Sequence, residues 1–288
     1  MSKISEADLI INEDGSIYHL NLLPEDIADT VITVGDPDRV GEVTKHFDSI
    51  ELKKGKREFK TQTGYIGKKR ITVLSTGIGT DNIDIVFNEL DALVNIDFDT
   101  REVKKELKSL EIIRFGTSGS VQENIEVGTI LASSYGLGLD ALMNYYEADN
   151  SIEEQYLLQK ITSHLPNLNA QPYLTAASKE LLEKIAFDMP QGITATAPGF
   201  YAPQGRKVRA QLKVDNLIEK INSFEHQNLK ITNLEMETAG IYALANALGH
   251  KALSVNAILA QRLKLKFASN PQQIVDKMIK TVLERVCG

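Results

Sequence analysis

The sequence is poor in the residues on which cross-linked and membrane-bound proteins depend. Its 288 residues include one cysteine, no tryptophan and only 6% aromatic side chains. Because Cys287 has no other cysteine with which to form a disulfide, we expect a reducing compartment. No stretch approaches the roughly 20 apolar residues of a membrane span, and the amino terminus lacks a signal-peptide core. We therefore expect a cytoplasmic protein with no membrane partner.

The sequence also lacks a basic cluster and any pattern of metal ligands. The net charge is −7 and the pI is near 5.4, whereas a nucleic-acid surface needs a clustered basic face. The nearest to a basic run, KKGKREFK at 53–60, is more typical of a solvated strand edge. The five histidines are far apart in the sequence. We expect no nucleic-acid partner and no metal.

Motifs for nucleotide cofactors and for catalytic nucleophiles are missing as well. The glycine-rich segment STGIGT at 75–80 matches neither the dinucleotide fingerprint nor the Walker A loop. No G-x-S-x-G elbow is present. We expect no organic cofactor, so any chemistry must come from positioning and electrostatics.

The composition is that of an ordinary globular protein, with 42% hydrophobic and 25% charged residues. The length suits one large α/β domain or two small ones. Because there is no linker, low-complexity tract or internal repeat, we predict a single domain over residues 1–288.

Short β-branched runs alternate with helical patterns along the chain. Helices are predicted at 82–94, 100–110 and 238–249, with Gly249 as a C-terminal cap. Alternation of this kind predicts a three-layer α/β/α sandwich with a mixed central sheet and ligands beyond the strand ends. Residues 139–180 are less periodic and are predicted to form a helical excursion with loops. The predicted strands are 30–36, 70–79, 110–120, 128–134, 192–199, 229–235 and 252–260.

Two segments that follow predicted strands are suited to an anion. In GDPDRV (35–40), Gly35 permits a tight path and Arg39 carries a fixed positive charge; an ordinary turn with a surface arginine has the same pattern. In RFGTSGS (114–120), an arginine before a Gly-Thr-Ser-Gly turn predicts a phosphate nest. Arg114 lies in an apolar run, so it needs an anionic partner, either phosphate or an internal carboxylate.

Two further segments carry groups suited to an organic ligand. In PGFYAPQGRKVR (198–209), an aromatic side chain, an amide and a guanidinium suit a planar ring with carbonyl edges, although a proline-bounded surface loop is the alternative. In TNLEMETAG (232–240), two glutamates stand at a predicted helix start. Carboxylates there are stabilised by about 0.3–1 kcal/mol whether or not they bind a ligand.

The motifs GDPDR, KREF, STGIG, RFGTSG, FYAPQGR and NLEMET occur in an order that resembles the nucleoside phosphorylase superfamily, in its uridine phosphorylase branch. The resemblance runs from about residue 18 to 262. It implies phosphorolysis of uridine, with inorganic phosphate as co-substrate and no cofactor. The residues it implies are, for phosphate, Gly35, Arg39, Arg57, Arg114 and Thr117; for ribose, His19, Glu235, Met236 and Glu237; and for the base, Phe200, Gln204 and Arg206.

The resemblance also implies an oligomer, because Arg57 and His19 would reach the site from a neighbouring subunit. A dimer, or a hexamer built as a trimer of dimers, is expected. The purine branch usually carries an aspartate after the last core strand, where this chain reads ILAQRL (258–263). The alternatives are a purine nucleoside phosphorylase or nucleosidase of the same fold, or a non-catalytic nucleoside-binding protein.

Overall fold

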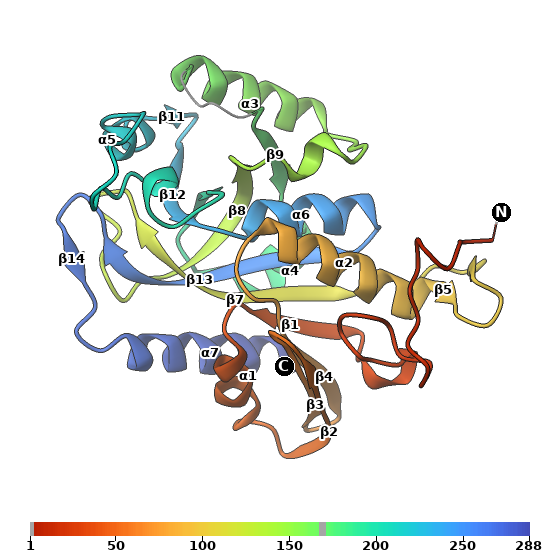
Figure 1. Ribbon diagram of the computed structural model, residues 1–288. Coiled ribbons are helices and arrows are strands. Elements are labelled where there is room, and N and C mark those ends of the chain that lie inside the picture. The colour runs from red at the N-terminus through yellow and green to blue at the C-terminus, as the bar shows by residue number, and fades with distance from the viewer. Residues whose placement is uncertain (1–2, 167–170) are drawn as a thin grey trace.

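The computed structural model describes residues 3–166 and 171–288, which are organised around a mixed β-sheet (Figure 1). Parallel pairs such as β1–β4, β1–β7 and β7–β13 lie next to antiparallel pairs such as β2–β3. The strands are β1 (Thr30–Val34), β2 (Ser49–Lys56), β3 (Phe59–Ile66), β4 (Lys69–Ser75), β5 (Ile96–Asp97), β6 (Glu102–Val103), β7 (Glu111–Ser120), β8 (Ile130–Gly138), β9 (Tyr173–Ala176), β10 (Gln191–Thr196), β11 (Glu225–His226), β12 (Leu229–Glu235), β13 (Lys251–Gln261) and β14 (Lys266–Phe267).

Part of this sheet closes on itself. The strand order is β11-β12-β10-β8-β13-β7-β1-β4-β3-β2, and β12 also pairs with β7 through Asn233–Ser120 and Leu234–Gly119. Strands β12, β10, β8, β13 and β7 therefore form a ring. The closure brings the end of β7 beside the end of β12, although they are more than one hundred residues apart in the sequence.

Helices cover both faces of the sheet. Figure 1 shows α2 and α6 on one face and α1 and α7 on the other, and α4 packs against both α7 and β13. These layers confirm the α/β sandwich. Within the described ranges, no helix combines the length and the apolarity needed to cross a bilayer. The helices are α1 (Pro37–Thr44), α2 (Thr80–Asn95), α3 (Ile152–His164), α4 (Lys179–Ile185), α5 (Leu217–Asn222), α6 (Thr238–Ala247) and α7 (Pro271–Cys287), with short 3-10 turns η1 (Pro24–Asp26), η2 (Leu142–Asn144) and η3 (Ala202–Gln204).

The hydrophobic core has two main clusters, both built on the sheet. The larger lies between β1, β4, β7, β13 and the helices α1, α2, α6 and α7. The smaller lies under α3 and α5, against β8, β10 and β12. Because the same sheet supports both clusters, the structure is consistent with one domain over residues 1–288, which stays a prediction.

Several sequence predictions are confirmed. The seven predicted strands are present, β2 is an edge strand with alternating exposure, and Gly249 follows α6 with a positive φ of 77°. The region 139–180 contains η2, α3 and β9, as a helical excursion with loops requires; its residues 167–170 lie outside the described residues.

Two sequence predictions are wrong. The helix predicted at 100–110 is absent, because these residues form the short strand β6 and a loop. The Gly-Thr-Ser-Gly turn after Arg114 is also absent. These residues continue β7, and their backbone groups pair with β13 as far as Ser120. A phosphate nest of free N–H groups therefore does not form there. Helix α7 was not predicted.

Helix α6 approaches the sheet unusually closely at Gly136 in β8. A Cβ atom on Gly136 would lie 2.7 Å from Cα and 3.0 Å from the backbone nitrogen of Ala239. Ala239 belongs to the first turn of α6, directly after Glu237 and Thr238. The glycine therefore sets how deeply the start of this helix sits on the sheet.

We predict that Gly136→Ala destabilises the protein by about 1–3 kcal/mol, because the added methyl group overpacks the contact with α6. The matched control is Gly41→Ala in α1, where a Cβ would meet nothing within 4 Å. That change should stabilise by about 0.5–1 kcal/mol through helix propensity. Thermal unfolding monitored by circular dichroism measures both. Equal stability of the two variants would contradict the prediction.

Candidate active site

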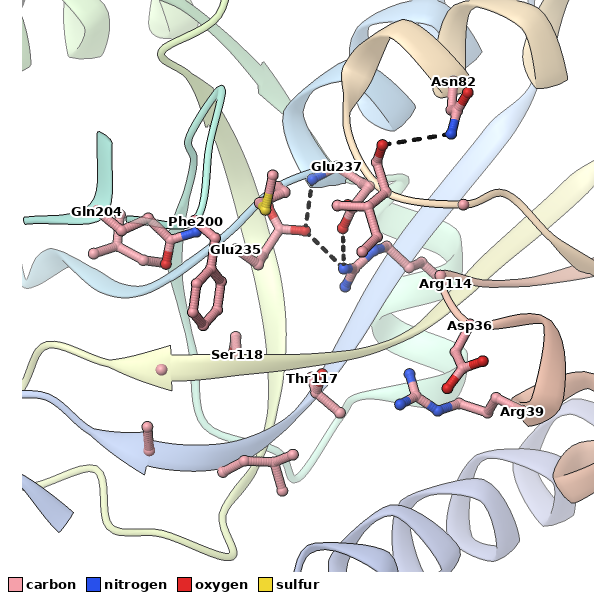
Figure 2. Close-up of a pocket in the computed structure, with 18 of the residues that line it drawn as sticks. Asp36, Arg39, Asn82, Arg114, Thr117, Ser118, Phe200, Gln204, Glu235 and Glu237 are labelled. Carbon is pink, nitrogen blue, oxygen red and sulfur yellow. Dashed lines mark hydrogen bonds and ion pairs between the residues drawn. The ribbon is translucent and has the colours of Figure 1, made fainter. Parts of the chain in front are cut away.

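A cavity of about 660 Å³ opens where β1, β7, β12 and β13 end. This volume lies in the range of small-molecule sites. Figure 2 shows Arg39 and Asp36 at one end, Phe200 and Gln204 at the other, and Arg114 with two glutamates between them. The predicted residues that line the cavity are Gly35, Arg39, Arg114, Thr117, Phe200, Gln204, Arg206, Glu235, Met236 and Glu237.

Arg114 forms a buried ionic cluster with both glutamates of the NLEMET motif. Its Nη2 lies 2.6 Å from Oε2 of Glu237 and 3.0 Å from Oε2 of Glu235. Burial disfavours the charged guanidinium, but the two carboxylates outweigh it and raise the pKa of Arg114. Internal carboxylates are therefore the anionic partners of Arg114, and they come from the end of β12 and the start of α6, more than one hundred residues away in the sequence.

The guanidinium of Arg114 occupies a space that exists because residue 116 is glycine. A Cβ atom on Gly116 would overlap Nη1 of Arg114. Arg114 and Gly116 are two residues apart on β7, so they face the same side of the sheet. The Arg-Phe-Gly sequence thus provides both the cation and the room in which it lies.

Glu235 supports the start of α6. Its carboxylate accepts hydrogen bonds from the backbone nitrogens of Glu237 and Thr238 and from the hydroxyl of Thr196. These are the free N–H groups that a helix leaves at its first turn. Glu235 thus connects β10, through Thr196, and Arg114 to the first turn of α6.

Glu237 is placed differently. One carboxylate oxygen accepts from the backbone nitrogen of Gly79 at 2.9 Å and the other binds Arg114. Burial raises the pKa of Glu237; Arg114 opposes this shift and the charge of Glu235 adds to it. Glu237 and the half-buried Met236 beside it both line the cavity.

Arg39 brings positive charge to its end of the cavity. Its guanidinium forms no hydrogen bond or ion pair within residues 3–166 and 171–288, although the nearby charges of Asp36, Glu42 and Glu237 favour its charged form. Burial lowers the pKa of Arg39, and the nearby charge of Arg114 lowers it further. Gly35 and Thr117 line the same end. Two converging guanidiniums with one unpaired suit a small anion.

The other end of the cavity is built from the loop that holds η3. The Arg206 guanidinium stacks on the Phe200 ring at 3.8 Å and donates to Oε1 of Gln204 at 2.6 Å. Gln204 is buried, whereas Phe200 is about half exposed. Burial, with the charge of Arg262 adding to it, lowers the pKa of Arg206 to about 10, so the group stays charged at neutral pH. The side chains together offer a flat, polar edge.

Arg262 belongs near this end and was not predicted. Burial lowers its pKa, and its Nη1 has no hydrogen-bond partner within the described residues. Its aliphatic stem packs over Gly119, where a Cβ would lie 3.4 Å away. Arg262 directly follows Gln261 in ILAQRL, the stretch noted above for the absence of an acid. The sequence signal that could have identified Arg262 is an arginine directly after a buried strand.

His19 and Arg57 do not line the cavity of their own chain. Nδ1 of His19 lies 2.6 Å from Oε1 of Glu89, and Arg57 is exposed in the turn between β2 and β3. Their neighbours touch, because Nζ of Lys56 donates to the backbone oxygen of Tyr18. The two residues thus belong to one surface outside this cavity. Their predicted role in a neighbouring subunit stays a prediction.

Other residues that line the cavity were not predicted. Some lie within the strands β7, β12, β13 and β14, and the rest follow β1, β2 or β4. In residues 3–166 and 171–288, no three His, Cys, Asp or Glu side chains converge in the way that a metal ion requires. The additional lining residues are Asp36, Pro37, Glu58, Gly77, Ile78, Asn82, Ser118, Gly119, Leu234, Leu259, Ala260 and Phe267.

The family model of the phosphorylase superfamily matches residues 29–287. This match covers most of the chain, so the protein belongs to that superfamily. The cavity and its ionic cluster lie within the matched residues.

Curated relatives extend over nearly the whole chain. A uridine phosphorylase of Thermococcus kodakarensis is 30% identical over 93% of this chain and 85% of its own. One of Haemophilus influenzae is 26% identical over 93% and 96%. A DeoD-type purine nucleoside phosphorylase of Buchnera aphidicola is 25% identical over 94% and 99%.

Among solved structures, a Trypanosoma brucei nucleoside phosphorylase described as showing uridine phosphorylase activity superimposes with a TM-score of 0.89. It is 30% identical, with 97% of this chain and 99% of that chain covered. A Toxoplasma gondii purine nucleoside phosphorylase shares the fold at a TM-score of 0.65 and 18% identity. The fold class is confirmed by these likenesses.

We predict that Gly116→Ala removes phosphate binding, because the new Cβ displaces the Arg114 guanidinium and leaves two buried carboxylates unpaired. Loss of a buried partner costs about 3–5 kcal/mol, so a marked fall in thermal stability should accompany it. Thermal unfolding with and without inorganic phosphate measures both effects. A folded variant that phosphate still stabilises like the parent protein would contradict the placement of Arg114.

Proposed function

We propose that this protein catalyses the phosphorolysis of uridine, in which uridine and phosphate give uracil and ribose 1-phosphate. The observation that carries the proposal is a single cavity with an unpaired cation at one end, a buried carboxylate in the middle and a guanidinium–amide edge at the other. The uridine phosphorylases among the relatives support the same substrate.

Phosphate binds at the end formed by Arg39, Arg114, Thr117 and the backbone at Gly35. Arg39 supplies a guanidinium that forms no hydrogen bond or ion pair with a described protein group, and Arg114 supplies donors not used by the glutamates. A dianion also relieves the repulsion between the two guanidiniums. This end therefore holds the nucleophile.

The ribose lies in the middle of the cavity. Glu237 accepts hydrogen bonds from its hydroxyls, the backbone at Met236 lies against it, and Glu235 holds both in register from behind. Fixing sugar and phosphate together turns a two-molecule encounter into a positioned reaction. A phosphate oxygen bonds to C1′ while the bond from C1′ to N1 of uracil breaks, through a sugar with oxocarbenium character.

The departing base carries the electron pair of the broken bond as negative charge. Gln204 and Arg206 bind its carbonyl edge, and Phe200 lies against the ring. Arg262, charged and without a described partner at Nη1, adds positive potential at this end. Groups already aimed at the charge that develops lower the barrier most. Solvent supplies the proton that completes uracil.

The base-binding end favours pyrimidines. Purine cleavage is assisted by an acid that protonates the base, whereas ILAQRL (258–263) carries Gln261 and Arg262 and no acid. Gln261 is buried and its side chain binds the backbone of Gln122 and Lys264. The Gln261 side chain is therefore already bonded to the protein backbone, which supports the pyrimidine preference.

The active form is a homo-oligomer, a dimer or a hexamer built as a trimer of dimers. His19 and Arg57 lie on one surface outside their own cavity. In the oligomer Arg57 reaches the partner's phosphate and His19 the partner's ribose. The reaction takes place in the cytoplasm, with inorganic phosphate as co-substrate and without an organic cofactor.

The experiment that tests this function is a substrate panel with and without phosphate. Purified protein is incubated with uridine, deoxyuridine, thymidine, inosine and adenosine, and free bases are separated by chromatography. We expect uracil release that depends on phosphate. Turnover of inosine or adenosine without uridine indicates a purine phosphorylase, undiminished activity without phosphate a nucleosidase, and binding without turnover a non-catalytic protein.

We predict that Arg206→Ala lowers kcat/KM for uridine by roughly 10- to 100-fold, because a hydrogen bond to a charged group is worth about 1.5–3 kcal/mol. The matched control is Arg209→Ala, an exposed arginine three residues along the same loop, which should change kcat/KM by less than twofold. Steady-state kinetics at saturating phosphate measures both. A similar loss in the two variants would mean that general positive charge on the loop matters, and not the guanidinium stacked on Phe200.

A further inference from the structure

We propose that Asn256 is a positioning residue that holds the Arg114 guanidinium in the orientation needed to bind phosphate. The inference rests on the proposed function for the role of Arg114, and on the geometry of Asn256 for the rest. Asn256 does not line the cavity. It lies in the middle of β13 with no exposed surface.

Asn256 contacts the terminal nitrogen of Arg114 that the glutamates do not use. Its Oδ1 accepts a hydrogen bond from Nη1 of Arg114 at 3.0 Å, while Nη2 binds Glu237 and Glu235. In the sheet register Asn256 pairs with Gly116, the residue whose missing side chain leaves room for the guanidinium. Arg114 is therefore held from two sides across a space that fits it.

The charges around Arg114 explain why a second contact is needed to fix its guanidinium. Two carboxylates attract Nη2, and by themselves they would draw the guanidinium towards α6. A neutral acceptor on the other nitrogen opposes this pull without adding a third negative charge near the phosphate end. It also fixes the guanidinium plane, so that the donors left over by the protein face the cavity.

Asn256 is itself fixed by a satisfied hydrogen-bond network. Its Nδ2 donates to Oγ of Ser133 at 3.1 Å and to Oγ of Ser254 at 3.2 Å, and Ser254 in turn meets the hydroxyl of Thr238 in α6. None of these polar atoms lacks a partner within the described residues. Fully satisfied buried networks are rigid, so Asn256 presents its oxygen in one direction.

The test compares Asn256→Ala with Ser254→Ala. Ser254 is paired with Arg114 in the sheet, but its hydroxyl bonds to Asn256 and not to the guanidinium. Titration calorimetry with inorganic phosphate on the full chain gives Kd without needing turnover, and steady-state kinetics gives KM for both substrates. We expect Asn256→Ala to weaken phosphate binding and raise its KM about tenfold. Ser254→Ala should change the Kd and the KM for phosphate by less than about threefold each.

At saturating phosphate, the KM for uridine should stay within about twofold of the parent value in Asn256→Ala, because Glu237 keeps its bond to Gly79. If Asn256→Ala does not fold, Asn256→Ser takes its place, since serine keeps a hydroxyl in the buried network while its shorter side chain withdraws from Nη1 of Arg114. The same tenfold effect on phosphate is expected of it.

The inference is overturned if the Asn256 variant affects phosphate no more than Ser254→Ala does, or if kcat and both KM values worsen together in proportion to lost thermal stability. Failure of the proposed function looks different. In that case the parent protein binds phosphate but releases no uracil from uridine, and the calorimetric comparison of the two variants still decides the role of Asn256.

Discussion

The structure of the site depends on one interaction, the buried ion pairing of Arg114 with Glu235 and Glu237. A guanidinium and two carboxylates removed from water are costly apart and tolerable together. Their pairing joins β7 to the start of α6, and the closure of the sheet between β7 and β12 brings the two segments within reach. Gly116 leaves the space, and Asn256 and Gly79 bind from the flanks.

The two glutamates of the NLEMET motif have different hydrogen-bond partners. Glu235 accepts backbone N–H groups at the first turn of α6, which is the ordinary use of an acid at a helix start. Glu237 faces Gly79 and Arg114 at the cavity. In TNLEMETAG, one glutamate therefore stabilises the helix start and the other faces the cavity.

Charge is distributed along the cavity in the order that phosphorolysis requires. Arg39 brings positive charge to one end, the glutamates bring negative charge to the middle, and Arg206 with Arg262 brings positive charge to the other end. A phosphate, a sugar that becomes cationic and a base that becomes anionic would each meet the opposite charge. No described cluster of metal ligands contributes to this arrangement.

The sequence by itself determined seven of the strands, two of the helices and ten of the cavity-lining residues, because β-branched runs, helical spacing and the segments after strand ends are local signals. It misplaced the Gly-Thr-Ser-Gly stretch, since glycine and serine favour turns locally whereas pairing with β13 keeps them extended. Only the tertiary structure decided the partners of Arg114. Glu235, Glu237 and Asn256 are more than one hundred residues away, and sheet closure and a missing Cβ, neither of them local, bring them together.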